Sequence, residues 1–345
     1  MRPVDRAGLL RRLSLGAGAA AVPGLLATAD ALAAGAEDGA GNFPAHPRWR
    51  FTFLSHETTD PLFVPLQYGL QDACALVGCS HRWAGSARGD VTELAAAFDK
   101  AVSDKADGIA VTIADAKALA GPVARALAAG IPVVAFHLDA RGSRLAFVGQ
   151  DPYAAGLKTG QRFAALVRSG EIALLAGSPA SRGVRERIAG IRAAFRSSGL
   201  PVTGKTVATA ADAYGAEERI AEYVEKSRGV RGLLAVDAVS TEGAGLAAKE
   251  KNLRARGVRA AGYGVLPATL KLVQEGHLEF TVDEQPYLQG FLSALQLFLV
   301  KLSGGLVVPS DVRTGSRLVT RANLKPYLAK TRFEGSSSKH RYPIA

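Results

Sequence analysis

Short apolar runs alternate with amphipathic segments from residue 50 of the chain onward. The apolar runs span 50–55, 107–113, 131–137, 145–149, 171–177, 231–237 and 278–283, and their length is typical of buried strands. Between them, apolar residues recur every three or four positions, as in an amphipathic helix, over 91–105, 116–129, 153–169, 183–198 and 215–227. Strands that alternate with helices predict parallel sheets covered by helices on both faces.

The length of the chain predicts two such sheets. Its 345 residues suffice for two hydrophobic cores of roughly 150 residues each. A content of 48% hydrophobic and 21% charged residues is typical of a globular protein rather than a disordered one. We therefore expect an α/β protein with two Rossmann-like lobes, each a three-layer α/β/α arrangement around a parallel sheet.

The formal net charge of +11 does not indicate a nucleic-acid partner. Lys and Arg are distributed over the predicted helices, and no basic stripe alternates with aromatic residues, as a nucleic-acid site requires. A generally basic surface is the simpler interpretation. We therefore expect no nucleic acid among the partners of the protein.

Residues 1–33 have the features of an export signal. Arg11 and Arg12 lie in a basic segment, and the apolar run that follows extends from residue 13 to 26 and ends near small residues. The arginine pair resembles the twin-arginine type of signal, and a general secretory signal is the alternative. Pro23 interrupts a run that is too short to span a membrane. We expect the mature chain in the periplasmic or cell-envelope space, not embedded in the membrane.

The cysteines and histidines give no sign of a metal centre. Cys74 and Cys79 are the two cysteines of the chain, and in an oxidising compartment they are able to form a disulfide, with two buried free thiols as the alternative. None of the six histidines stands at metal-ligand spacing from them. No metal and no cofactor is expected.

One stretch imitates a nucleotide-binding motif. Residues 199–206, GLPVTGKT, fit the pattern GxxxxGK[ST] of a phosphate-binding loop. The stretch follows a predicted helix and leads into a strand, whereas a phosphate-binding loop follows a strand and opens a helix. We expect a simple turn, and no pairing of a nucleophile with a base indicates an enzyme.

Polar and aromatic residues follow several of the predicted strands. In parallel sheets ligands bind at the carboxyl ends of the strands, and both halves of the chain carry hydrogen-bonding and aromatic side chains there. The residues are Ser55, His56, Thr58, Thr59, Asp60, Phe63, His137, Asp139, Tyr214, Asp237 and Tyr263. Such groups bind neighbouring hydroxyls and cover C–H faces, which suits a hydroxyl-rich ligand.

Six motifs together resemble the periplasmic sugar-binding proteins of bacterial ABC transporters, the group typified by ribose-binding protein. They are SHETTDPLF, GIPVVAF, FVGQDPYAAG, RERIAGI, TVDEQPYLQG and VRTGSRLVTRANL, and they follow the order of the family between residues 50 and 327. TVDEQPYLQG is most similar to the family variant DQQPYLQG, found among binders of simple sugars and sugar alcohols. The resemblance implies the type I periplasmic binding protein fold.

The resemblance also implies how the chain is divided. In this family the chain crosses between the lobes three times in a three-stranded hinge, and the expected crossings are 149–151, 283–285 and 308–311. The implied parts are a signal at 1–33, a linker at 34–48, a first lobe from 49–150 and 285–308, a second lobe from 151–284 and 309–328, and a tail at 329–345.

A set of sugar contacts follows from the same resemblance. The matched positions are Ser55, Asp60, Phe63, His137, Asp139, Arg185, Tyr214, Asp237, Glu284 and Gln285. The chain departs from the family at His137, where a carboxylate is usual and Asp139 compensates, at Gly264, where an aspartate is usual, and at Glu284, where glutamine is usual. A partly buried histidine and a helix cap are the alternative roles of His137 and Asp60.

The implied function is binding without catalysis. Proteins of this family trap a small neutral sugar or sugar alcohol between their lobes and deliver it to the permease of an ABC transporter. A ligand-sensing partner of a membrane receptor is the alternative function for the same fold.

Overall fold

The computed structural model describes residues 43–139 and 144–328, so the predicted signal at 1–33, most of the linker and the tail at 329–345 lie outside the described residues. The first lobe is built on a six-stranded sheet in which all neighbouring strands are parallel. In the order β11-β5-β4-β3-β1-β2, its strands are Val312–Arg313, Ala146–Gly149, Val133–Phe136, Gly108–Val111, Arg50–Ser55 and Ser80–Gly85.

The second lobe is built on another six-stranded sheet, and the pair β10–β12 is its one antiparallel pair. In the order β12-β10-β9-β8-β6-β7, its strands are Arg317–Val319, Thr281–Asp283, Arg259–Tyr263, Val230–Ala235, Gly170–Ala176 and Val202–Ala208. The stretch at 199–206 runs from the end of a helix into β7 and forms the expected turn.

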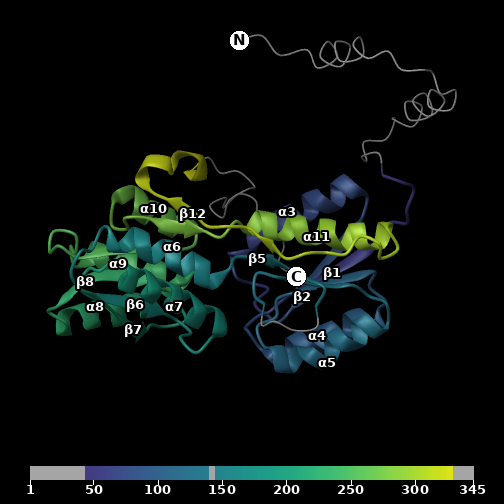
Figure 1. The fold of residues 1–345 in the computed structure, drawn as a ribbon, viewed down its shortest axis with the longest axis horizontal. Coiled ribbons are helices and arrows are strands. Elements are labelled where there is room, and N and C mark those ends of the chain that lie inside the picture. The colour runs from purple at the N-terminus through teal and green to yellow at the C-terminus, as the bar shows by residue number, and fades with distance from the viewer. Residues whose placement is uncertain (1–42, 140–143, 329–345) are drawn as a thin grey trace, which may run out of the picture. The chain divides into compact units, whose positions relative to one another are not determined.

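Helices cover both faces of each sheet (Figure 1). In the first lobe α3 (Phe63–Val77) and α11 (Pro286–Leu302) lie on one face, and α4 (Val91–Ser103) and α5 (Ala116–Ala128) on the other. In the second lobe α6 (Pro152–Ala164) and α7 (Arg182–Ser197) lie opposite α8 (Ala213–Lys226), α9 (Ala238–Glu250) and α10 (Pro267–Glu275), and the 3-10 helices η1 (Arg321–Asn323) and η2 (Lys325–Leu328) follow β12. The prediction of two parallel-sheet α/β lobes is confirmed.

The alternation of side chains along each strand divides the core of a lobe into two halves. Phe51 and Phe53 of β1 are fully buried in the cluster beneath α3 and α11, whereas Leu54 is buried in the cluster beneath α4 and α5. Successive strand residues point to opposite faces of a sheet. A strand that is covered on both faces therefore has a continuous apolar run, which is the pattern seen in the sequence.

Paired glycines bring two helices of each lobe into backbone contact. A Cβ atom at Gly69 of α3 would lie 2.0 Å from the carbonyl oxygen of Tyr287 in α11, and one at Gly290 would lie 2.1 Å from that of Leu66. The same arrangement joins α6 and α7, where Gly156 faces the carbonyl of Arg187 at 2.0 Å and Gly190 faces that of Tyr153 at 2.1 Å. Any larger residue at these positions would force the helices apart.

Three segments carry the chain between the lobes, and hydrogen bonds connect them. The first joins β5 to α6, the second joins β10 to α11, and the third joins β11 to β12. Gln150 Nε2 donates to the hydroxyl of Ser316 at 3.0 Å, and the hydroxyl of Thr314 donates to the carbonyl of Glu284 at 3.0 Å. Because β11 pairs with β5, the third segment spans 314–316 rather than the expected 308–311.

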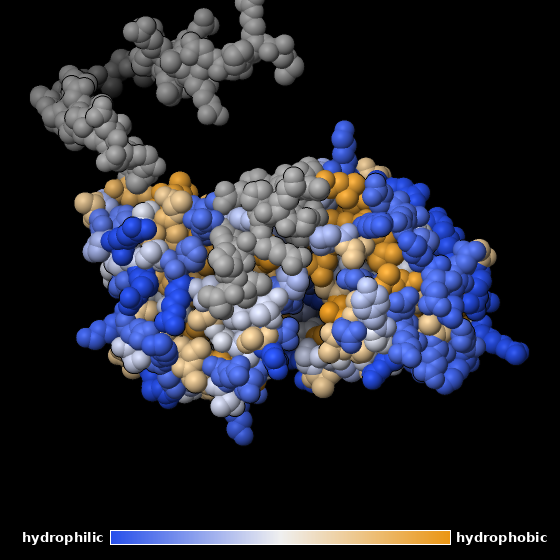
Figure 2. Space-filling view, turned by 180° about the vertical axis from the view of Figure 1, so that it is seen from behind, coloured by the Kyte–Doolittle hydropathy of each residue, from blue (hydrophilic) through white to orange (hydrophobic). Residues whose placement is uncertain are grey.

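Hydrophilic side chains are prominent on the surface, as one face of the molecule shows. Figure 2 shows one face on which hydrophilic residues predominate and apolar residues form smaller patches between them. No helix within 43–139 or 144–328 is long and apolar enough to cross a membrane.

Candidate ligand-binding site

A cavity of about 300 Å³ lies at the carboxyl ends of strands from both sheets. Its wall includes residues that directly follow β1, β4, β6, β8 and β9, together with Asp237 and residues of two crossing segments: His56, His137, Gly177, Val236, Gly264, Asp237, Gln150 and Glu284. Ligands of parallel sheets bind at such strand ends. The volume is within the range of small-molecule sites.

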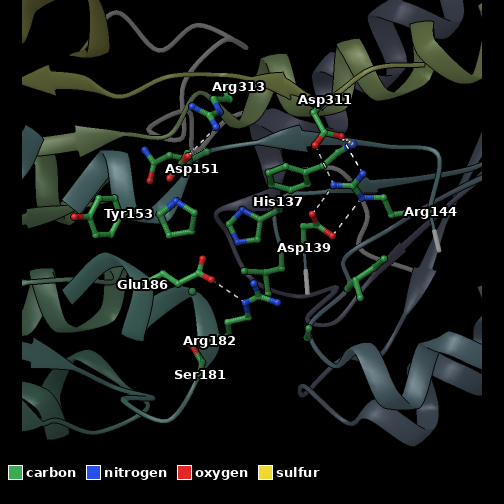
Figure 3. A pocket seen from close by; sticks show the side chains of 17 residues that line it. His137, Asp139, Arg144, Asp151, Tyr153, Ser181, Arg182, Glu186, Asp311 and Arg313 are labelled. Carbon is green, nitrogen blue, oxygen red and sulfur yellow. Dashed lines mark hydrogen bonds and ion pairs between the residues drawn. The ribbon is translucent and has the colours of Figure 1, made fainter. Parts of the chain in front are cut away.

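A larger cavity of about 710 Å³ adjoins the first and shares His137 and Gln150 with it. Figure 3 shows that charged side chains surround this larger cavity and pair with one another: Arg144 with Asp139 and Asp311, Arg182 with Glu186, and Arg313 with Asp151. The strand-end groups converge on the smaller cavity instead. We therefore place the candidate site in the smaller cavity.

Two neutral histidines and a phenylalanine form the first-lobe wall of the site. The rings of His56 and His137 are nearly parallel, with centroids 6.1 Å apart, and Phe63 meets both edge-on. Burial, and then the neighbouring His137, lower the pKa of His56 to about 3, and burial also lowers the pKa of His137. A neutral imidazole has one donor and one acceptor, and because Nδ1 of His56 is already bonded to the Thr112 hydroxyl at 3.2 Å, its other ring nitrogen is the one left for a ligand hydroxyl.

The loop that follows β1 adds a carboxyl group to this wall. Asp60 accepts a hydrogen bond from the backbone N–H of Leu62 at 2.8 Å, just before α3 begins. Burial raises the pKa of Asp60 to about 6. The group thus stabilises the turn before the helix and also lines the cavity, but it does not cap α3, because the N-cap residue of that helix is Leu62 and no side chain caps it.

Arg187 of α7 is the centre of the polar network in the site. Its guanidinium donates hydrogen bonds to the carboxylate of Glu284, to the side-chain oxygen of Gln150 at 2.8 Å and to the carbonyl of Val236 at 2.5 Å. The side chains of Arg187 and Glu284 are only 13% and 9% exposed. Burial alone lowers the pKa of Arg187, but the facing Glu284 carboxylate raises it above the ordinary value. The pair therefore joins the second lobe to a crossing segment through a buried ionic contact.

A tyrosine holds the guanidinium in place. The centroid of the Tyr263 ring lies 4.0 Å from the central carbon of the Arg187 guanidinium, which is a cation–π distance. Tyr263 is itself buried, and its hydroxyl is hydrogen-bonded to that of Thr159 in α6 at 2.8 Å. Burial raises the pKa of Tyr263 to about 12. Arg187 is thus fixed between a ring, a carboxylate and an amide before any ligand is present.

Asp237 lines the cavity and also caps α9. One carboxylate oxygen accepts from the backbone N–H of Ser240 at 2.8 Å, and the other accepts from that of Gly177 at 2.9 Å. Each carboxylate oxygen has further lone-pair capacity. Asp237 therefore remains able to accept a hydrogen bond from a ligand.

The structure brings part of the predicted contact set together. Asp60, His137, Asp237 and Glu284 line the cavity. Phe63 and Ser55 are fully buried, Phe63 against the two histidines and Ser55 where its hydroxyl accepts a hydrogen bond from the N–H of Glu57. These two residues shape the first-lobe wall from behind.

The remaining predicted contacts lie elsewhere. Asp139 lines the larger cavity and pairs with Arg144 at 2.6 Å. Gln285 has a left-handed backbone (φ 60°) ahead of α11 and lies outside the cavity lining. Arg185 donates to the carbonyl of Ala180 beside a separate surface depression, and Tyr214 is 76% exposed.

The register of α7 explains why Arg187, and not Arg185, enters the site. Arg187 stands one residue before Ile188 and four before Ile191, which are both buried in the second-lobe core. Arg185 stands four before the exposed Ala189. Residues three or four apart share a face of a helix, and Arg185 also stands three before Ile188, so the apolar spacing within RERIAGI favours Arg187 as the inward arginine without separating the two fully. His56 had a simpler signal, since it directly follows β1.

The described residues contain no group of three or more His, Cys, Asp or Glu side chains arranged to hold a metal ion. The histidines of the cavity instead have Thr112, Phe63 and each other as neighbours.

The chain that forms this cavity is similar to several known proteins. Residues 51–303 match the family described as the periplasmic binding protein domain. The xylose/arabinose-binding protein XylF of Sulfolobus acidocaldarius is 39% identical over 317 residues, which cover 87% of this chain and 78% of the relative.

Solved structures share the fold at lower identity. A sugar-binding protein of a sugar ABC transporter from Bacillus halodurans superimposes with a TM-score of 0.74 at 22% identity, over 81% of this chain and 99% of that one. A carbohydrate transporter protein from Acidothermus cellulolyticus, solved with myo-inositol, superimposes with a TM-score of 0.72 at 24% identity, over 84% of this chain and 100% of that one.

Proposed function

Because the chain belongs to the family of periplasmic binding proteins, we propose that it binds a small neutral sugar or sugar alcohol between its lobes and delivers it to the permease of an ABC transporter. The buried network around Arg187 carries this proposal. It presents a fixed guanidinium, a carboxylate and an amide at one end of a cavity of about 300 Å³. Such planar groups bind adjacent hydroxyls in pairs.

The charges of the cavity favour a neutral ligand over an anionic one. Among the described residues that line the cavity, Arg187 is the one cation, and Glu284 already neutralises it. Asp60 and Asp237 add further acidic groups. A sugar acid or sugar phosphate would meet these carboxylates without a free cation to balance it. Hydroxyl groups instead find acceptors on the carboxylates and both donors and acceptors on the neutral histidines.

The relative at 39% identity gives the first ligands to test. That protein is named for xylose and arabinose, so we propose pentoses as the leading candidates. No chemical step is proposed, since ligand capture and release suffice for this function.

Export is part of the proposal. In this proposal residues 1–33 serve as the signal that directs the mature protein to the periplasmic or cell-envelope space, and the arginine pair favours the twin-arginine route over the general secretory one. The three crossing segments act as the hinge on which the lobes close over the ligand. A smaller radius of gyration in solution scattering with ligand than without it is the expected sign of closure.

A thermal-shift screen tests the binding function. D-xylose, L-arabinose and myo-inositol are compared with D-glucuronate and a pentose phosphate, each at a saturating concentration. Ligand at a hundredfold excess over Kd stabilises by about 2.7 kcal/mol, which raises the melting temperature of a chain of roughly 300 residues by about 4 °C. At least one neutral compound is expected to do so. A shift with the acid or the phosphate, and none with any neutral sugar, contradicts the proposal.

A further inference from the structure

The surface depression beside Arg185 forms a basic groove on the second lobe. It has a volume of about 310 Å³ and lies between α7 and β7, which are neighbours in Figure 1. Three arginines of α7 line it, and none of the other described residues that line it is acidic: Arg185, Arg192 and Arg196, with Pro179, Ile188, Ala189 and Thr206. The basic groove shares no lining residue with the ligand cavity, so it is a separate cationic surface.

The three arginines form a stripe along one side of α7. They stand seven and four positions apart, a spacing that keeps side chains on one face of a helix. At a rise of 1.5 Å per residue, the stripe is about 17 Å long. Arg185 and Arg192 donate hydrogen bonds to uncharged groups, and all three residues are exposed. No ion pair between described residues neutralises the stripe, whereas Arg182 of the same helix pairs with Glu186.

β7 is an edge strand, and its free edge borders the stripe. It stands last in its sheet and pairs with β6 alone among the described strands. The carbonyl of Pro201 and the N–H of Thr209 bond the two ends of β6 at 3.0 and 2.9 Å, so the backbone groups of odd-numbered residues point toward β6. Those of Gly204 and Thr206 point away from it, and the Gly204 carbonyl accepts from Arg192 at 3.3 Å. A free strand edge is a template for a further strand.

An extended acidic segment fits both features of this surface. Five residues of a strand span about 17 Å at 3.3 Å each, which equals the length of the stripe. A Cβ atom at Gly204 would lie 3.3 Å from the Phe195 ring of α7, so alternate side chains of an added strand point to the face that carries the arginines. Lipid headgroups and nucleic-acid phosphates are negatively charged too, but they offer no row of N–H and C=O groups to a strand edge.

We propose that the basic groove docks an extended acidic segment of another protein. The segment adds a strand to the free edge of β7, and its carboxylates pair with Arg185, Arg192 and Arg196. In the free protein Arg192 bonds the Gly204 carbonyl and so protects the edge, and the segment takes its place. This interaction surface goes beyond sugar binding and does not rest on the proposed function.

Fluorescence anisotropy with labelled peptides and the mature protein tests this proposal. The probe is a blocked heptapeptide of alternating Glu and Thr, and the same peptide with Lys in place of Glu is its control. The acidic peptide is expected to bind roughly tenfold or more tightly than the basic one, because the stripe attracts the first and repels the second. The acidic peptide methylated on every backbone nitrogen has no N–H donor for the edge, and its binding should be roughly fivefold or more weaker.

Two kinds of variant ask whether the stripe and the edge cause the binding. Arg192→Glu with Arg196→Glu should weaken binding of the acidic peptide roughly tenfold or more, whereas Arg228→Glu with Arg256→Glu, an equal change of charge at exposed sites outside the basic groove, should change it less than about threefold. Thr206→Pro removes an outward N–H and no bond to β6, so it should weaken binding roughly fivefold or more, unlike Thr206→Val. Melting curves show whether each variant is folded.

Each outcome supports or overturns the docking surface. Equal binding of the acidic and basic peptides, or equal losses in the two arginine pairs, overturns it. If Thr206→Pro is folded and binds as tightly as Thr206→Val, or if the methylated peptide binds as tightly as the unmethylated one, no strand is added and the proposal is wrong. Vesicles of phosphatidylglycerol that bind through Arg192 and Arg196, when the acidic peptide does not, would show a lipid surface instead. Sugar binding is measured separately, so none of these results bears on the proposed function.

Discussion

Replacing Arg187 with alanine is the most informative single change in the site. The guanidinium bonds Glu284, Gln150 and the carbonyl of Val236, and it lies against the ring of Tyr263. Removing it leaves a carboxylate that is 9% exposed without its cation. The loss of a buried ionic partner destabilises a protein by about 3–5 kcal/mol. We expect the low end of that range, because water in the cavity reaches Glu284 once the arginine is gone.

The same change should weaken ligand binding strongly. A charge-assisted, paired contact to ligand hydroxyls contributes about 2–4 kcal/mol, so Arg187→Ala is expected to raise Kd by roughly thirty- to a thousandfold. Arg187→Lys keeps the charge but loses the planar guanidinium, so its Kd should lie between those of the wild type and Arg187→Ala. Calorimetric titration with the best sugar of the screen gives Kd, and thermal melts of the free protein give stability.

Arg185→Ala is the matched control. It removes an arginine from the same helix, but Arg185 is exposed and donates only to the carbonyl of Ala180. We expect its Kd to stay within threefold of the wild type. The reasoning from helix register is refuted if Arg187→Ala also stays within threefold, or if Arg185→Ala shows the larger loss. A double variant with Glu284→Gln adds a further check, since the two changes should be less than additive in stability.

Three further predictions concern stability and reactivity. Because the pKa of Asp60 in the folded protein is raised to about 6, its contribution to stability is greatest at low pH and is lost as the pH rises through 6. In urea unfolding, the free energy of unfolding of the wild type relative to Asp60→Asn should fall by up to about 3 kcal/mol between pH 4 and 7. A difference that does not change with pH contradicts this. In thermal melts Gly69→Ala should destabilise the protein by about 1–3 kcal/mol or more, because the added methyl group meets the Tyr287 carbonyl. The control Gly121→Ala in α5 places its methyl group against a flexible arginine and should not destabilise the protein. Equal effects of the two changes would refute the close helix contact. Cys74 and Cys79 are free thiols that are 3% and 5% exposed. They should react slowly with a thiol reagent in the native protein and fully after unfolding without reductant. If no thiol reacts after unfolding, the two cysteines form the disulfide that was the alternative from the sequence.

The strand and helix pattern predicted the architecture because each sheet is covered on both faces. The strands within these runs, such as Gly108–Val111 and Val133–Phe136, are apolar and buried at every position, which separates them clearly from the helices between them. The third crossing was harder to place. β11 is a strand of only two residues, Val312–Arg313, and it is held by pairing with β5 rather than by any local pattern. Such a strand has no periodicity to detect.

The candidate site was predictable where a side chain directly follows a strand. His137, Asp237 and Glu284 reach the cavity because the strand end fixes their position. Residues carried on helices and longer loops were less certain, since a shift of two positions along α7 separates an inward arginine from an outward one. Tyr214 shows the same limit, because nothing in the local sequence distinguishes an aromatic side chain that covers a cavity from one that faces solvent.

The paired glycines hold two helices of each lobe rigidly together next to the segments that carry the chain between the lobes. The heptapeptides QDPYAAG and EQPYLQG span the starts of α6 and α11, and in both the tyrosine carbonyl touches a glycine of the neighbouring helix, α7 or α3. Because the two helix backbones are in direct contact, with no space between them, neither helix is able to slide against its partner. Any rotation of one sheet against the other must be absorbed by torsions in the few residues before Pro152 and Pro286 and in the segment 314–316. If the lobes close as proposed, the crossings are therefore the parts that bend, and each packed helix pair moves as one rigid body with its side of the cavity.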